Sequence, residues 1–171
     1  MSTLAYERVH DNLKRLKRMT IESIVDNYLE IAATENRSTL EVLDYLFNQE
    51  LKNKEDRALS LRLRMAGFPM EKKLDDFDTK FQPSIDPTVI NDLGSLRFIH
   101  NMENVVFLGP PGVGKTHLAL ALGHEAVRHG FRVYFANAST LIERLVKANR
   151  VNKLEERIKG LKNCLFVISS G

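Results

Sequence analysis

The first third of the chain places its apolar residues at helical spacing. They recur at positions 21, 24, 25, 28, 29 and 32, at intervals that bring them onto one face of a helix. Thr20 precedes this series and is a residue type that can cap a helix start. Residues 13–65 contain neither Gly nor Pro. The pattern therefore predicts long helices with few interruptions.

A second helix is predicted to begin after Ser38. The order Ser38-Thr39-Leu40-Glu41 allows the serine hydroxyl and the glutamate carboxylate to satisfy two free amide groups at a helix start. Residues 59–65 alternate between apolar and polar types, which would also fit a strand. No turn signal separates them from the preceding segment, so we favour one helix that ends before Gly67 and Pro69.

The second half of the chain alternates short β-branched runs with helical segments. Strands connected by helices imply parallel pairing in an α/β sheet. The predicted strands are residues 105–108, 132–136 and 164–168, and the predicted helices are residues 115–129, 139–149 and 151–162.

Composition and charge limit the possible classes of protein. The 171 residues are 43% hydrophobic and 27% charged, as is usual for a folded globular chain. The 25 Lys and Arg residues exceed the 22 Asp and Glu residues by three, which permits a polyanionic partner without requiring one. One Cys and five scattered His residues predict neither a disulfide nor a structural metal. No stretch of 18 apolar residues is present, so we expect a cytoplasmic protein without membrane contact.

The residues with the clearest chemistry form the pattern G-x-x-x-x-G-K-T at residues 109–116, between a predicted strand and a predicted helix. Glycines let successive backbone amides point inward around an anion, and the helix adds its positive end. Lys115 would place its charge near the β and γ phosphates, and Thr116 would ligate Mg²⁺. His117 is expected to contribute a backbone amide. The predicted nucleotide-binding residues are Gly109, Pro110, Pro111, Gly112, Val113, Gly114, Lys115, Thr116 and His117.

Basic residues in the helical half are candidates for DNA contact. They lie beside apolar residues, a pattern that suits a helix laid against a phosphate backbone and equally suits a solvated helix face. Acidic residues in the same region, such as Glu22 and Asp26, oppose an extended basic patch. The candidates are Lys14, Arg15, Lys17, Arg18, Arg57, Arg62 and Arg64.

The chain resembles the IstB-like ATP-binding helper proteins of bacterial insertion sequences, which are relatives of the helicase loader DnaC. The resemblance extends over residues 16–168 and rests on three segments: residues 77–83, residues 93–99 and residues 103–119, which include the phosphate loop. It implies an AAA+-type ATPase with a small helical N-terminal domain. It also implies a homo-oligomer that assembles on DNA and directs a transposase.

The resemblance stops at the C-terminal end of the chain. The family continues from the last apolar strand into an Asp-Glu pair that orders Mg²⁺ and activates water, whereas this chain has Ser169, Ser170 and Gly171. We therefore expect the N-terminal part of a family member, with negligible ATP hydrolysis. The expected fold is α/β, with an incomplete AAA+-type parallel sheet and flanking helices. The expected organisation is a helical domain (residues 1–66), a linker (residues 67–87) and the first part of a P-loop ATP-binding domain (residues 88–171).

The leading hypothesis is a helper protein of insertion-sequence transposition that binds Mg-ATP and acts on DNA with a transposase. The alternatives are a DnaC-like helicase loader, a small P-loop kinase and a non-hydrolysing ATP-binding fragment. Measuring hydrolysis with and without DNA would separate them.

Overall fold

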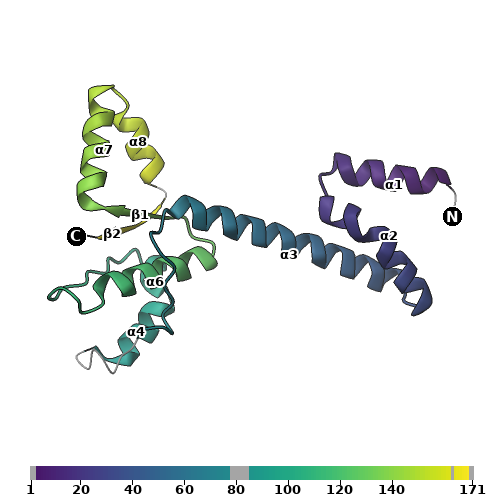
Figure 1. Ribbon diagram of the computed structural model, residues 1–171, viewed down its shortest axis with the longest axis horizontal. Helices are drawn as coiled ribbons and strands as arrows, with labels where there is room; N and C mark the ends of the chain where they lie inside the picture. Colours follow the sequence, from purple (N-terminus) through teal and green to yellow (C-terminus); the bar gives the residue numbers. More distant parts are fainter. Residues whose placement is uncertain (1–2, 78–84, 163, 170–171) are drawn as a thin grey trace. The chain divides into compact units, whose positions relative to one another are not determined.

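The computed structural model describes residues 3–77, 85–162 and 164–169. The chain forms two compact units, Met1–Ala58 and Leu59–Gly171. The described residues are mostly helical, with two strands (Figure 1).

The first unit is helical and contains α1 (Thr3–Arg15), α2 (Met19–Thr34) and the first part of α3 (Thr39–Ala66). The predicted apolar face of α2 is confirmed, because four of its six members are buried in a core shared with α3 and the other two are partly buried against that core. Glycine and proline are absent throughout, so nothing interrupts α3 before Gly67, as predicted. The core of this unit consists of Ile21, Val25, Tyr28, Ala32, Val42 and Leu46.

The two turns of this unit share one geometry. Lys17 and Asn36 each adopt a left-handed conformation, with φ of 55° and 53°. After α1, the Arg18 amide donates to the Leu13 carbonyl at 2.8 Å and the Lys17 amide donates to the Lys14 carbonyl at 2.9 Å. This is the Schellman arrangement, which satisfies carbonyls at a helix end and prefers glycine or asparagine at its left-handed position.

Side chains satisfy the first amides of α2 and α3. The predicted capping box is confirmed: the Ser38 amide donates to Glu41 Oε2 at 2.7 Å, and the Glu41 amide donates to Ser38 Oγ at 3.3 Å. The cap of α2 comes from α3, because the Thr20 and Ile21 amides both donate to Glu50 Oε2, at 3.1 and 3.2 Å. These bonds link the N-terminal end of α2, which follows the turn after α1, to α3.

The second unit contains the end of α3 and all remaining elements. The predicted elements of residues 115–168 are confirmed to within a few residues, as α6, β1, α7, α8 and β2. The bounds are α4 (Pro87–Gly94), α5 (Arg97–His100), α6 (Lys115–Arg128), β1 (Val133–Asn137), α7 (Ala138–Arg150), α8 (Leu154–Leu161) and β2 (Leu165–Ser169).

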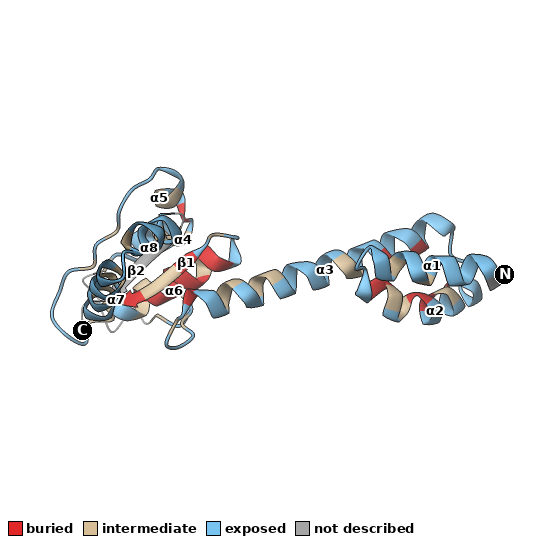
Figure 2. Cartoon of the chain, turned by 90° about the horizontal axis from the view of Figure 1, so that it is seen from above, coloured by how far each residue is buried: buried red, intermediate tan, exposed pale blue. Residues whose placement is uncertain are grey.

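The strands β1 and β2 are neighbours and run parallel, from Val133 opposite Leu165 to Asn137 opposite Ser169. Parallel pairing was predicted from the alternation of strands and helices, and it is confirmed for this pair. The buried side of α6 packs beside β1, with Val127 fully buried and Leu120 1% exposed (Figure 2). The loop that precedes α6 therefore leads into a helix that is anchored by its buried side.

The predicted strand at residues 105–108 is wrong. Within the described part of the chain these residues form no strand, and the only ladder joins β1 to β2. A strand needs backbone partners on a neighbouring strand, and no described segment pairs with this one. Val106 and Leu108 are accordingly 73% and 88% exposed despite their apolar side chains.

Candidate functional site

The phosphate-loop motif forms a series of turns that leads directly into α6. Gly112 and Gly114 have φ values of 82° and 88°, in the left-handed region that costs glycine little. Gly114 is also the N-cap of α6, and no described side chain caps that helix start. The first amides of α6 therefore keep their donors available at the positive end of the helix.

Lys115 folds its side chain back over the loop. Its Nζ donates to the carbonyl oxygens of Gly109 at 2.9 Å and Pro110 at 2.8 Å. These bonds hold the ammonium group beside the same loop that carries the open amides. Backbone donors and a lysine charge at one helix start form a site suited to an anion such as a phosphate group.

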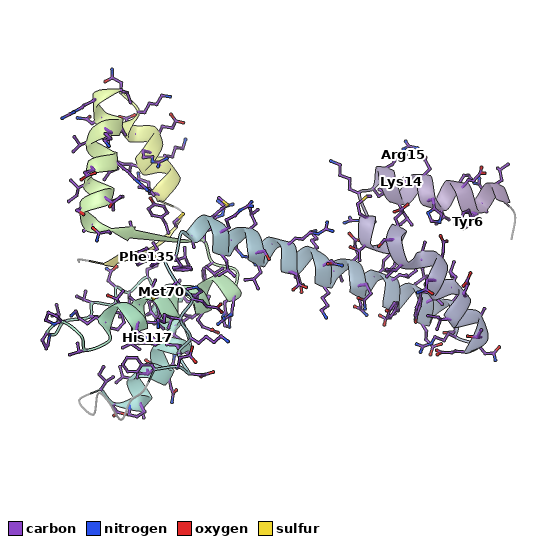
Figure 3. The ribbon with its side chains drawn as sticks, viewed as in Figure 1. Tyr6, Lys14, Arg15, Met70, His117 and Phe135 are labelled. Carbon is purple, nitrogen blue, oxygen red and sulfur yellow. The ribbon has the colours of Figure 1, made fainter. Side chains whose placement is uncertain are left out.

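The two residues after Lys115 differ in what their side chains do. Thr116 is exposed in the first turn of α6 and carries a hydroxyl oxygen, a donor type that Mg²⁺ accepts. The His117 ring, labelled in Figure 3, contacts another segment. Its Nε2 lies 3.3 Å from the Lys73 carbonyl oxygen, and the ring meets Phe77 edge-on at 5.5 Å. The sequence indicated a backbone role for His117 and gave no sign of this side-chain contact.

A cavity of about 760 Å³ opens beside the loop. Its wall is mainly apolar, and the lining includes both Lys115 and Val113 of the loop region. Asp92 and Arg97, which form an ion pair, add polar groups to the same wall. The remaining apolar lining comes from Ile85, Val89, Ile90, Leu93, Phe98, Val105, Val106, Phe107, Leu108 and Leu118.

The first group of DNA candidates gathers where α1 ends. Lys14 and Arg15 lie in the last turn of α1 (Figure 3), and Lys17 and Arg18 form the turn that follows. Two of these cations have acidic neighbours. Lys14 Nζ lies 3.6 Å from Glu22 Oε1, and Arg15 Nη1 lies 3.8 Å from Asp11 Oδ2. The carboxylates offset part of the positive charge of this cluster.

The second group of DNA candidates does not form a single cluster within either unit. Arg57 belongs to the first unit, whereas Arg62 and Arg64 belong to the second. Arg62 is half-buried, and its Nε atom is buried without a hydrogen-bond partner among the described residues. Arg57 and Arg64 are exposed.

Sequence reasoning missed a more strongly basic surface on α7 and α8. An open cavity of about 600 Å³ between these helices and the turn that joins them is lined by Arg144, Lys147, Lys153 and Arg157, with one carboxylate, Glu156. Among the described residues, no ion pair engages these four cations. The recurrence of Lys or Arg at positions 144, 147, 150, 153 and 157 was the signal that could have identified this surface. We call the surface lined by these four cations the α7–α8 basic cavity.

No helix in the described part of the chain has the length and apolarity needed to cross a membrane.

Comparison with known proteins gives one consistent family. A family model described as IstB-like ATP binding protein matches residues 11–169. A Pseudomonas aeruginosa protein named as the ATP-binding protein of insertion sequence IS21 is 43% identical over 156 residues, which cover 91% of this chain and 59% of that relative.

Two further relatives carry corresponding names. The protein named for insertion sequence IS5376 of Geobacillus stearothermophilus is 37% identical, over 90% of this chain and 61% of its own length. The protein named for insertion sequence IS232 of Bacillus thuringiensis is also 37% identical, over 91% of this chain and 62% of its own length. The chain thus spans about three fifths of the length of these relatives.

Proposed function

Because the chain belongs to the family of IstB-like ATP-binding proteins, we propose that residues 109–116 bind the phosphates of ATP as part of a P-loop fold. The observation that carries this proposal is the loop itself. The start of α6 has uncapped amides, and the Lys115 ammonium group is held against the same loop by the Gly109 and Pro110 carbonyls, so backbone donors and a positive charge are available at one helix start. The order of loop, α6 and β1, with β2 parallel to β1, supports the same fold.

Mg²⁺ would accompany the nucleotide at Thr116. The hydroxyl of this residue is exposed at the loop end of α6, where it can supply one oxygen ligand. Mg²⁺ is commonly held by few protein oxygens, with substrate phosphates and water completing its coordination. The residues present therefore fit the ion, which would neutralise phosphate charge in the bound complex.

The cavity beside the loop is the proposed place for the nucleoside. Its volume of about 760 Å³ lies within the range usual for small-molecule sites, and its mainly apolar wall suits the faces of a base. Lys115 lines this cavity and also contacts the loop. A nucleotide could thus place its phosphates on the loop and its base among apolar side chains of α4 and α5.

Equilibrium binding of a fluorescent ATP analogue, with Mg²⁺ present, tests this proposal. Lys115→Ala removes a contact between charged groups, which is worth roughly 1.5–3 kcal/mol, and affinity should fall by about ten- to hundredfold. Lys52→Ala removes an equal charge from an exposed position on α3 and should leave affinity unchanged. Equal affinity of the wild type and Lys115→Ala would refute nucleotide binding at this loop.

The wider role that we propose is that of a helper in insertion-sequence transposition, acting on DNA with a transposase in the cytoplasm and assembling as a homo-oligomer. The support is the family, whose members are named for insertion sequences. For DNA contact, the α7–α8 basic cavity adds a surface with four cations and one carboxylate. The cluster of Lys14, Arg15, Lys17 and Arg18 is the second proposed surface, with part of its charge offset by Glu22 and Asp11.

A further inference from the structure

The segment that precedes α4 in the chain runs along α6. Residues 71–77, here called the strap, contact α6 near both of its ends. Near the C-terminal end of α6, Arg128 Nη2 lies 3.5 Å from Glu71 Oε1. Near the N-terminal end, the Lys73 carbonyl oxygen and the Phe77 ring both contact His117. A turn between Leu74 and Phe77, closed by a 3.0 Å bond from the Phe77 amide to the Leu74 carbonyl, directs the aromatic ring.

Phe77 touches the two residues that bracket Lys115 and Thr116. On one side, the ring occupies the space beside Gly114, where a Cβ atom would come within 2.6 Å of Phe77 Cε2. On the other side, the ring meets His117 edge-on at an interplanar angle of 79°. The first turn of α6 is therefore packed from outside by one aromatic side chain.

The His117 contact assigns a donor role to one nitrogen of its ring. A carbonyl oxygen only accepts hydrogen bonds, so the 3.3 Å contact with Lys73 requires His117 Nε2 to carry a proton and to donate it. The strap is thus held at the loop by one polar contact and one aromatic contact. Neither contact occupies the backbone amides or the Lys115 ammonium group that face the proposed phosphate site.

We propose that the strap positions the phosphate loop, with Phe77 and His117 as positioning residues. The loop would bind an anion through backbone N–H donors that are already oriented toward it. A donor that is free to move binds the anion less strongly. Because binding free energies are reciprocal, a strap that tightens nucleotide binding is itself held more firmly when nucleotide is bound. The expected effect on affinity rests on the function proposed above, whereas the positioning of the first turn of α6 does not.

Paired variants test the two contacts. Phe77→Ala should weaken binding of the fluorescent ATP analogue by about tenfold, within the range usual for coupled sites. Phe77→Tyr keeps an aromatic ring at this position and should bind the analogue as tightly as the wild type does. His117→Leu should also weaken binding, whereas His117→Gln retains a donor for the Lys73 carbonyl and should recover most of the affinity.

Phe131→Ala is the matched control, because Phe131 also meets a histidine edge-on, His100 at 5.5 Å, and packs against the core of the second unit. It should lower the melting temperature without the selective loss of affinity. Wild-type affinity in Phe77→Ala, or an equal loss in Phe131→Ala and Phe77→Ala, would overturn the inference.

Hydrogen exchange without nucleotide separates this inference from the proposed function. In Phe77→Ala the Leu118 amide, which donates to the Gly114 carbonyl at 2.9 Å, should exchange faster than in the wild type, and in Phe131→Ala it should not. Trypsin should cut at Lys72 and Lys73 more slowly when wild-type protein holds nucleotide, and Lys115→Ala should remove this protection. If the wild type binds no nucleotide, the proposed function fails and exchange decides alone: selective acceleration supports the strap, and unchanged exchange overturns it.

Discussion

Lys17 shows how a single residue can be placed against its own conformational preference. It occupies the left-handed position of the turn after α1, with φ of 55°, where a side chain costs about 1–2 kcal/mol relative to glycine. Lys17→Gly should therefore raise the free energy of unfolding of the first unit by about 1 kcal/mol. Urea denaturation followed by circular dichroism measures this change.

The neighbouring Arg18→Gly variant is the control for Lys17→Gly. Arg18 has φ of −96°, so glycine relieves no left-handed strain there and should destabilise the unit. A lower stability for Lys17→Gly would mean that the lysine side chain contributes more than its conformation costs.

At the scale of single residues, the sequence predicted the backbone geometry of the loop but not the contact that the loop region makes with a distant segment. Gly112, Gly114 and Lys115 follow from a motif whose physical logic is local, and the structure gives both glycines positive φ. The contact between His117 and Lys73 joins residues far apart in the chain, so no local spacing could have revealed it.

Elements depend on contacts that their own residues do not supply, and the start of α2 is an example. Arg18 offers no side-chain cap, and Glu50 of α3 accepts the Thr20 and Ile21 amides instead. Glu50→Ala should destabilise the first unit by about 1–3 kcal/mol, because it leaves two part-buried donors without their acceptor. Glu55→Ala, at an exposed glutamate of the same helix, should change stability little. Chemical denaturation compares them, and equal stabilities would contradict the capping role.

The contact between α1 and α2 should depend on pH. Tyr6 OH donates to Asp26 Oδ2 at 2.8 Å, and this bond lowers the pKa of Asp26 and raises the pKa of Tyr6. The contribution of Asp26 is present above its unfolded pKa of about 3.9 and is lost as pH falls through the lower folded value. The contribution of Tyr6 is present below about pH 10 and is lost as pH rises through the higher folded value.

Tyr6→Phe should consequently lower the stability of the first unit at pH 7 and have a smaller effect at pH 2. Denaturant midpoints at the two pH values, with NMR titration of the Asp26 carboxyl group, provide the measurement. In the variant the pKa of Asp26 should move back toward its ordinary value. An unchanged Asp26 titration would show that the tyrosine bond does not act on this carboxylate.

The predicted helices succeeded because their stabilising interactions are local, and the predicted strands β1 and β2 succeeded because each is the parallel partner of the other. The apolar face of α2, the capping box of α3 and the α6 helix each follow from residues within one element. Residues 105–108 failed because a strand is completed by its neighbour, and β-branched composition alone cannot supply one. The helix α1 was not predicted because its residues are mostly polar, and much of its attachment comes from the bonds of Tyr6 and His10 to Asp26.

For the whole molecule, a net charge of +3 is too small to identify a DNA-binding surface, so the arrangement of charges must do so. Two fourfold replacements by Gln compare the candidates, and each changes the net charge from +3 to −1 because it removes four cations. One replaces the cations of the α7–α8 basic cavity, Arg144, Lys147, Lys153 and Arg157. The other replaces the cluster at the end of α1, Lys14, Arg15, Lys17 and Arg18.

We expect the cavity variant to lose more of the salt dependence of DNA binding. Each phosphate neutralised contributes roughly 0.9 log unit of affinity per log unit of salt. At the end of α1, Glu22 and Asp11 already lie within 4 Å of two cations, so fewer of that group can neutralise phosphates. Fluorescence anisotropy of a labelled duplex over a range of salt concentrations gives both slopes. Equal slopes of log affinity against log salt concentration in the two variants would mean that net charge governs binding. A smaller slope for the α1 variant would mean that the DNA-binding surface lies in the first unit.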